Sequence, residues 1–453
     1  MSRPRLEEAI GLPHATAMVV GTIIGASIFV QPSEVTGQVP SVLGIYAVWA
    51  VSGLLTLCGA LVCAELASVY PESGGVYVFL RETLSPALGF LWGWAMFWTM
   101  HSGIIAAIGM VCARYVGFFV PLGDAGIRIV AIGVILFLSA VNYVGVRQGT
   151  LLQTAFTAGK LLAVLTIILV GFALGGPSAD AGGGLLDPGA ASGPAAATSS
   201  GFSAGDFALA LVAGLFAFGG WHMVTYQAEE TVDATSTIPR ALVIGTVLVT
   251  VCYILLNAVY LHVLPLERVA LSDRVAADAA DAVLGRGGGM VMSGLVVFST
   301  FGALAGIVLA GPRVYFAMAR DGLLFDWVAE LHPRFRTPHR AIVLQGIWSS
   351  VLVLTGTYRA LFTRVIYTEW IFFGLMAVGL IVLRRRRSEP PPYRVPLYPA
   401  VPLLFAVSAF AIVASQIANA PLDSALGLGF VAVGWPVYRI WSGPSRTKTS
   451  ATR

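Results

Sequence analysis

Long, almost uncharged runs of apolar residues make up most of this chain. A helix that crosses a lipid bilayer needs about 20 mostly apolar residues. Twelve segments of this kind can be marked in the sequence, at roughly 12–30, 41–67, 87–119, 127–145, 150–175, 206–227, 240–264, 289–317, 340–357, 362–383, 397–419 and 424–441. The pattern predicts an all-α polytopic membrane protein with twelve transmembrane helices.

Composition supports this fold class and excludes several others. Hydrophobic residues make up 57% of the 453 residues and charged residues only 11%, and the mean hydropathy is +0.83. A soluble chain carries about 25% charged residues, so a soluble enzyme or a disordered regulator is excluded. The net charge of +4 gives no basis for binding nucleic acid. The expected environment is the lipid bilayer.

Cysteine and histidine positions predict no metal centre, no cofactor and no catalytic residues. The four cysteines lie inside apolar segments and show no Cys-x-x-Cys or Cys/His ligand spacing, so we expect free thiols. The six histidines are scattered and form no HExxH motif, whereas an integral-membrane enzyme would need clustered histidines or carboxylates.

The distribution of basic residues predicts the topology. If the segments alternate from a cytoplasmic N-terminus, most of the 27 Lys and Arg residues fall on the inside. The positive-inside rule then places both termini in the cytoplasm, with the protein in the cell (inner or plasma) membrane. We expect a single transmembrane domain over residues 1–443 and a cytoplasmic tail at 444–453. Residues 175–205 are expected to form a flexible outward linker, and 266–289 an outward loop with a short surface helix.

Closely spaced glycines mark two of the twelve segments. Gly21 and Gly25 lie in the first segment, and Gly219 and Gly220 lie in the sixth. Glycine is about 1 kcal/mol worse than alanine in a helix, so each pair permits a break. The freed amides and carbonyls could bind a ligand where they line a cavity. Alternatively, the glycines allow close helix packing.

The positions of these two segments indicate an internal repeat. They stand five helices apart, which matches two inverted five-helix repeats whose first helices are broken near the membrane midplane. The repeats would span residues 11–175 and 206–383, with two further helices at 397–441.

Six motifs follow one another along nearly the whole chain. They are Gly21–Phe29, Pro71–Tyr77, Phe216–Trp221 with Ile238–Ala241, Phe298–Gly302, Arg320–Gly322 with His332–Pro333, and Pro392–Pro396. In this order they resemble the amino acid–polyamine–organocation (APC) superfamily, and within it the L-type and related bacterial amino acid permeases. The resemblance implies a transport domain with a five-plus-five inverted-repeat core, added helices 11 and 12, and alternating access for an amino acid substrate.

The resemblance also implies where the substrate carboxylate binds. It would contact free amides near Gly25, Ala26 and Ser27, at the positive end of a half-helix. The family's usual Gly-Ser-Gly is replaced here by Gly25-Ala26-Ser27. Backbone recognition of a carboxylate survives this change because amides need no side chain, but the identity of the substrate is left open.

The substrate's amino group and side chain would lie against the second break. In the resemblance, the amino group meets carbonyls near Ile23, Phe216 and Ala217. Phe218 would close over the substrate side chain, and Gly219 would leave room for it.

Lys160 lies near the centre of the fifth segment. At about 1.5 Å per residue it sits about 15 Å deep in a core about 30 Å thick, where a lysine costs about 2.5–3.5 kcal/mol on insertion scales. It is therefore expected to face the bundle interior, in coupling or gating or as a structural tether. The resemblance implies that it replaces a bound sodium ion, donating near Gly21 and to Ser299 or Thr300.

Two further polar residues have alternative interpretations. His222 could contact the substrate side chain, or it could be a core residue with its own partners. Glu369 is expected at the membrane interface, with a polar lining role as the alternative.

Glu229 and Glu230 directly follow the sixth segment. They could form a cytoplasmic gate with Arg81 or Arg313, or they could be solvated loop charges.

A secondary transporter fits these features best. The chain has no GxxxxGK[ST] loop for ATP, and a channel would need a repeated filter or rings of charge. We expect amino acid transport by sodium-independent exchange or proton-coupled uptake. The alternative substrate is a polyamine or other organic cation, which would need pocket carboxylates, and none lies near either break in the sequence.

Cysteine placement bears on partner subunits. Eukaryotic members of the resembled family pair with a single-span glycoprotein through an extracellular cysteine. No cysteine lies in a predicted outside loop here, so we expect no obligatory partner subunit.

Overall fold

The computed structural model describes residues 10–25, 27–144, 146–176, 202–285, 287–355, 358–419 and 421–441. Regular structure in this part is helical, apart from one isolated bridge between Ile10 and Thr231. Most of the linker expected at 175–205, and the whole tail expected at 444–453, lie outside the described residues.

The first half of the described chain contains eight α-helices and two short turns of other helix types. These are α1 (Leu12–Ile23), η1 (Ser27–Phe29), α2 (Gln31–Gln38), α3 (Val42–Val69), α4 (Val76–Thr83), α5 (Pro86–Ala95), η2 (Met96–Met100), α6 (His101–Val116), α7 (Asp124–Val144) and α8 (Val146–Leu174).

The second half has the same character. Its elements are α9 (Ala204–Ala217), η5 (Trp221–Glu230), α10 (Ala234–Val263), α11 (Leu266–Leu271), α12 (Val275–Leu284), α13 (Gly288–Arg320), η6 (Asp326–Ala329), α14 (His339–Thr355), α15 (Tyr358–Arg386), α16 (Ala400–Asn419) and α17 (Pro421–Trp441).

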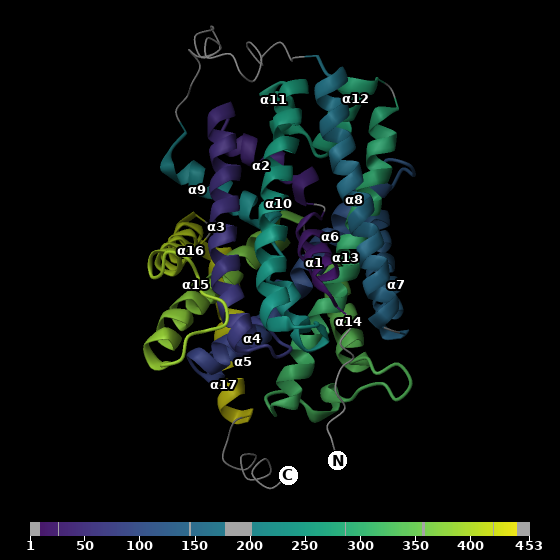
Figure 1. Ribbon diagram of the computed structural model, residues 1–453. Coiled ribbons are helices and arrows are strands. Elements are labelled where there is room, and N and C mark those ends of the chain that lie inside the picture. Colours follow the sequence, from purple (N-terminus) through teal and green to yellow (C-terminus); the bar gives the residue numbers. More distant parts are fainter. Residues whose placement is uncertain are drawn as a thin grey trace.

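Length and hydropathy make this an all-helical, polytopic membrane protein. Eight helical stretches of the described chain are long and apolar enough to cross a bilayer. They are Val42–Val69, Pro86–Val116, Asp124–Val144, Thr154–Leu174, Ala204–Glu230, Ala234–Val263, Gly288–Arg320 and Ala400–Asn419. Figure 1 shows the long helices α3, α8 and α10 lying along roughly the same axis, with α11 and α12 at one end of the bundle and α4 near the other.

Local sequence explains how several helices begin. Ser41 caps α3 by accepting a hydrogen bond from the Gly44 amide. Ser203 and Asp206 form a reciprocal capping box at the start of α9. These caps satisfy amides that have no partner within the helix, and so fix the boundaries of two helices that contact the central region.

The core is centred on the short helix α1, which packs against α10, α8 and α13. Gly245 of α10 allows the close approach, because a β-carbon there would lie 2.6 Å from Val19 Cγ1. The loop expected at 266–289 holds two short helices, and α12 packs against α13 with Val275 and Ala276 fully buried. α12 is therefore part of the packed structure, whereas the short helix α11 exposes Glu267, Arg268 and Leu271 and agrees with the expected surface helix.

A buried ion pair holds α15 against α3. The Arg384 guanidinium donates two hydrogen bonds of 2.6 Å to the two carboxylate oxygens of Glu65, whose side chain is 1% exposed. The Val395 amide donates to the same carboxylate at 2.7 Å. Two parallel bonds of this kind fix orientation as well as distance, so α15 has a defined position in the bundle.

Candidate functional site

The first candidate element of the site is the interruption between α1 and η1. Helical hydrogen bonding ends with the Ile24 amide donating to Val20 O at 2.8 Å. The Gly25 amide then turns to Ile23 O at 2.7 Å, and helical structure restarts at Ser27. Backbone groups between the two pieces have thus lost their regular partners. Ala26, which was expected to supply a carboxylate-binding amide, lies outside the described residues.

The second interruption lies between α9 and η5. The Gly219 amide donates to Phe216 O at 2.9 Å, and Gly220 adopts a left-handed φ of 96° before η5 begins at Trp221. A β-carbon at Gly220 would lie 3.1 Å from Thr22 O. Glycine is therefore needed here both for its conformation and for the close approach of the α1 backbone.

Two side chains join the interruptions to each other. The Tyr253 hydroxyl lies 2.8 Å from Ile23 O and 3.0 Å from Ala217 O, and the Thr22 hydroxyl lies 3.2 Å from Gly220 O. A hydroxyl has a single proton and so donates to one carbonyl at a time. Tyr253, from α10, was not identified from the sequence, where nothing distinguishes it from other aromatic residues in a long apolar helix.

One cavity lies where the interruptions meet. Five residues predicted for the substrate site line it: Ile23, Gly25, Ser27, Phe216 and Gly219. Six further residues complete the lining: Thr22, Ile104, Ile108, Met223, Ile307 and Glu369. The cavity has a volume of about 10 Å³, which is room for about one water molecule. The cavity is therefore nearly closed in this conformation.

Two other predicted contact residues lie behind the lining. Ala217 and Phe218 are 1% and 0% exposed and are not among the residues that line the cavity. The Phe218 ring packs against Tyr253, with ring centroids 5.0 Å apart. In this conformation Phe218 therefore supports Tyr253 rather than covering the cavity.

Lys160 reaches the first interruption from α8. Its ammonium donates to Gly21 O at 2.6 Å and to Ile24 O at 3.0 Å, and the residue is 1% exposed. Both acceptors belong to α1. The Thr300 hydroxyl donates to Val297 O, within its own helix, and no contact from Lys160 to Ser299 or Thr300 is found in the described chain.

For Glu369 the first of the two sequence-based expectations is wrong. It was expected at the membrane interface, with a polar lining role as the alternative. The structure agrees with the alternative, because Glu369 on α15 is 4% exposed and lines the cavity. The expectation that no carboxylate lies near the interruptions fails for the same reason. Nothing in the local sequence signals this, because the carboxylate is brought there by the packing of α15 against α6 and α9.

His222 lies apart from the cavity lining. Its ring packs among Trp221, Tyr226, Phe373 and Trp92, with centroid distances between 4.9 and 5.8 Å. The residue is 1% exposed and is not a lining residue. The structure therefore surrounds this candidate side-chain contact with aromatic core.

Ion pairs join η5 to α13 at one end of the bundle. Arg320 donates to Glu229 at 3.0 Å, and the buried Arg313 lies 3.5 Å from Glu230. The Ser73 amide, which precedes α4, also donates to Glu229 at 3.3 Å. Glu230 thus pairs with one of its two expected partners, and Glu229 pairs with an arginine that was not expected.

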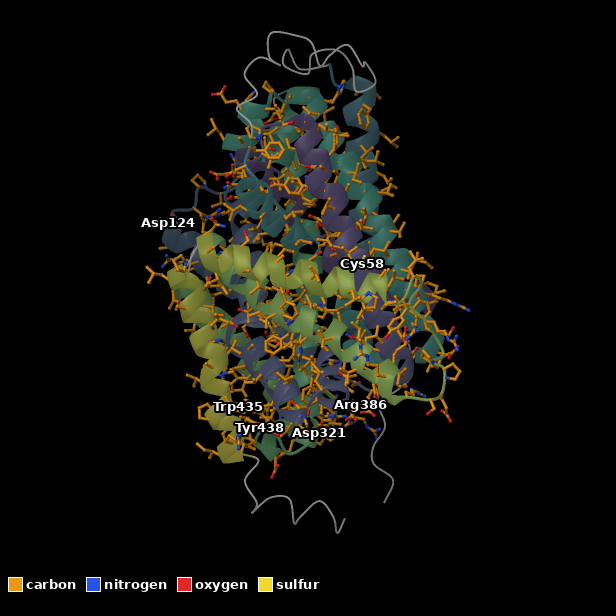
Figure 2. All side chains as sticks on the ribbon, turned by 90° about the vertical axis from the view of Figure 1, so that its left-hand side faces the viewer. Cys58, Asp124, Asp321, Arg386, Trp435 and Tyr438 are labelled. Atoms are coloured by element: carbon orange, nitrogen blue, oxygen red, sulfur yellow. The ribbon has the colours of Figure 1, made fainter. Side chains whose placement is uncertain are left out.

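Asp321 extends this cluster to α4. It pairs with Arg81 and accepts a 2.6 Å hydrogen bond from the Tyr77 hydroxyl. Burial and the neighbouring Asp321 carboxylate raise the pKa of Tyr77, so its hydroxyl keeps its proton and remains a donor. Figure 2 shows Asp321 at the same end of the molecule as Arg386, whose neighbours are the basic residues at the end of α15.

No group of three or more potential metal ligands occurs in the part of the chain that the structure describes. The polar groups that the described residues bring to this site are freed backbone groups, the hydroxyls of Thr22, Ser27 and Tyr253, the Lys160 ammonium and the Glu369 carboxyl group.

Comparison with known proteins gives a consistent result. The family model for amino acid permeases matches residues 10–435. The chain is 32% identical to the serine/threonine exchanger SteT of Bacillus subtilis (strain 168), over 96% of each chain. It is 32% identical to the human b(0,+)-type amino acid transporter 1, over 92% of this chain and 84% of the relative. It is 33% identical to the rabbit (Oryctolagus cuniculus) large neutral amino acids transporter small subunit 2, over 96% and 80%.

Proposed function

Since this chain belongs to the amino acid permease family, we propose that it carries amino acids across a cell membrane by alternating access, either by sodium-independent exchange or by proton-coupled uptake. The observation that carries the proposal is the meeting of two interrupted helices on one cavity. Non-helical backbone at membrane depth is tolerated only where it is buried in protein or lines a cavity, and there it can bind a polar substrate.

The substrate carboxylate is assigned to the first interruption. Gly25 and Ser27 lie where helical structure restarts, and at such a helix start the macrodipole favours negative charge. The Ala26 amide is assigned to the same group. Gly25 and Ser27 line the cavity, which supports this assignment.

The amino group is assigned to carbonyls of Ile23, Phe216 and Ala217. Tyr253 already lies within hydrogen-bond distance of two of them. A carbonyl has two lone pairs. Ile23 O already lies within reach of the Gly25 amide and of the Tyr253 hydroxyl, so an ammonium group would bind there when the single Tyr253 proton is donated to Ala217 O instead. Tyr253 would then hold the acceptors in place before the substrate arrives.

Lys160 is assigned the role of a fixed cation. Transporters with interrupted helices often bind sodium through unwound backbone carbonyls. Here an ammonium contacts two such carbonyls, Gly21 O and Ile24 O. One positive charge from the chain would thus replace one bound sodium ion, and transport would not require sodium.

The proposed architecture is a single transport domain over residues 1–443. It comprises repeats at 11–175 and 206–383 and two further helices at 397–441, in twelve spans with both termini in the cytoplasm. Its support is that helical structure occurs in each of the twelve apolar segments and that the first helix of each repeat is interrupted.

We also propose that the chain works without an obligatory partner subunit, although the name of one relative calls it a small subunit. All four cysteines are buried free thiols, so none is presented for a disulfide to another chain.

Counterflow in proteoliposomes tests the proposed transport. Vesicles loaded with a mixture of amino acids should accumulate labelled amino acid at equal rates in sodium and choline buffers. Gly219→Trp should abolish counterflow, because the indole would fill the cavity. Gly37→Trp is the matched control, since nothing lies within 4 Å of a β-carbon there. Strict sodium dependence, or full activity of Gly219→Trp, would contradict the proposal.

A further inference from the structure

Glu369 places a carboxylate in the same cavity as both helix interruptions. The residue is 4% exposed, and α15 holds it there through the Glu65–Arg384 pair near its end. An ionised carboxylate that is removed from water is costly unless a cation or several donors approach it, and without them the group takes up a proton. A cation that pairs with Glu369 must therefore come either from another side chain or from a ligand in the cavity.

The described part of the chain supplies no cation to Glu369. No hydrogen bond or ion pair joins its side chain to another described residue, and the group that interacts with it electrostatically is the Tyr226 hydroxyl. The buried cations have other partners: Lys160 donates to α1 carbonyls, and Arg313 donates to Leu309 O beside Glu230. The carboxylate is thus available to a cation that enters the cavity.

The other lining residues indicate which further groups such a ligand would carry. Backbone groups of the two interruptions can bind an α-carboxylate and an α-amino group. Four apolar side chains, Ile104, Ile108, Met223 and Ile307, also line the cavity. They suit an aliphatic stem, which gains free energy by leaving water. A ligand with a zwitterionic head, an aliphatic stem and a terminal cation would contact the backbone groups, the apolar side chains and the Glu369 carboxylate respectively.

We propose that Glu369 binds the ammonium or guanidinium group of a cationic amino acid side chain, so that the site selects basic amino acids over neutral ones of the same length. This inference rests on the proposed amino acid transport. A carboxylate that is paired with an ammonium in a water-poor cavity discriminates strongly against a ligand that leaves it unpaired. The nearly closed cavity must widen to admit the ligand, and side-chain movement at the apolar wall can provide that space.

Competition in the counterflow assay tests the selectivity. Lysine should compete at least about tenfold better than norleucine, which has the same stem without the ammonium, because a hydrogen bond to a charged group contributes about this ratio or more. Arginine should likewise exceed citrulline. Glu369→Gln should remove both preferences while norleucine still competes. Glu267→Gln, an exposed carboxylate on α11, is the control for loss of one negative charge and should keep both preferences.

The outcomes separate this inference from the proposed function. Equal competition by lysine and norleucine in the wild type, or an unchanged ratio in Glu369→Gln, would overturn the role of Glu369 and leave amino acid transport intact. Counterflow of cadaverine as fast as that of lysine would show that the α-carboxylate is unnecessary and would overturn the selection of amino acids. No counterflow of any amino acid would contradict the transport proposal itself.

A binding measurement keeps the test decisive if Glu369→Gln does not fold. In detergent, lysine should raise the Tm of the wild-type protein and norleucine at the same concentration should not. An equal rise with both ligands would overturn the selectivity.

Discussion

At the scale of single residues, Lys160 supplies donors that the interrupted helix α1 has lost. In a continuous helix Gly21 O would accept from the Gly25 amide, but that amide turns to Ile23 O. Lys160→Met keeps the stem and removes the ammonium, which leaves two buried carbonyls without that donor at about 1–3 kcal/mol each. We therefore expect the initial counterflow rate to fall at least about tenfold, which corresponds to 1.36 kcal/mol in the barrier.

A neighbouring residue provides the matched control. Thr157, one turn earlier on α8, donates to Ala17 O at 3.2 Å, which is also on α1 but away from the interruption. Thr157→Val should lower the rate by no more than about fivefold, because an ordinary hydrogen bond contributes only about 1 kcal/mol. Wild-type turnover in Lys160→Met, or an equal loss in Thr157→Val, would contradict a specific role for the ammonium.

The sequence placed Lys160 inside the bundle directly, whereas it offered a lining role for Glu369 only as the alternative, and the reason is positional. A lysine that lies ten or more residues from both ends of an apolar segment, as Lys160 does in the segment at 150–175, is conspicuous. Glu369 was placed near the start of a segment predicted at 362–383, whereas α15 begins earlier, at Tyr358. A shift of four residues moves a side chain about 6 Å along the helix axis, which separates an interfacial carboxylate from a buried one.

At the scale of elements, ion pairs and hydrogen bonds join η5, α13 and α4 at one end of the bundle, and we propose that they close this end of the transport path. The Glu229–Arg320 pair is partly exposed, with side chains 27% and 34% accessible. Such a pair contributes about 0.2–1 kcal/mol. Glu229→Gln should therefore raise the fraction of molecules that are open at this end by a factor of about 1.5 to 5. Ser73→Cys, in a background without the native cysteines, reports this as a faster reaction with a thiol reagent.

Two further variants serve as a comparison and a control for that labelling measurement. Arg320→Gln should accelerate labelling as much as Glu229→Gln, because the two changes remove the same contact. Glu330→Gln breaks the exposed pair with Arg340 elsewhere on the surface and should leave the rate unchanged. If Glu229→Gln and Arg320→Gln label no faster than Glu330→Gln, the Glu229–Arg320 pair does not restrain opening.

Glycine spacing predicted where the two helices are interrupted, because few other residues tolerate a left-handed turn such as that at Gly220. Short elements were less predictable. α4 has only eight residues, and η2 interrupts the third apolar segment with a five-residue π-helical turn. Neither changes the hydrophobic pattern, because both remain largely buried among other helices.

At the scale of the whole molecule, hydropathy predicted a polytopic helical protein more reliably than it predicted individual spans. α1 has 12 residues because of its interruption, and α14 has 17. Neither is long enough to count as a span by length alone. Their membrane depth depends on the neighbours that surround them. The antiparallel relation of the two proposed repeats is likewise a property of packing, which a single sequence does not encode as a pattern.

The proposed topology places opposite ends of the bundle on opposite sides of the membrane. Asp273, between α11 and α12, and Ser388, after the arginines that end α15, are both exposed. The basic cluster at Arg384–Arg387 favours the cytoplasmic side. Background labelling should be low, because the four native cysteines are buried. In intact cells a membrane-impermeant maleimide should therefore label Asp273→Cys, and it should label Ser388→Cys only after permeabilisation. Labelling of Ser388→Cys in intact cells, with Asp273→Cys protected, would invert the orientation, and labelling of both would exclude the proposed number of spans between them.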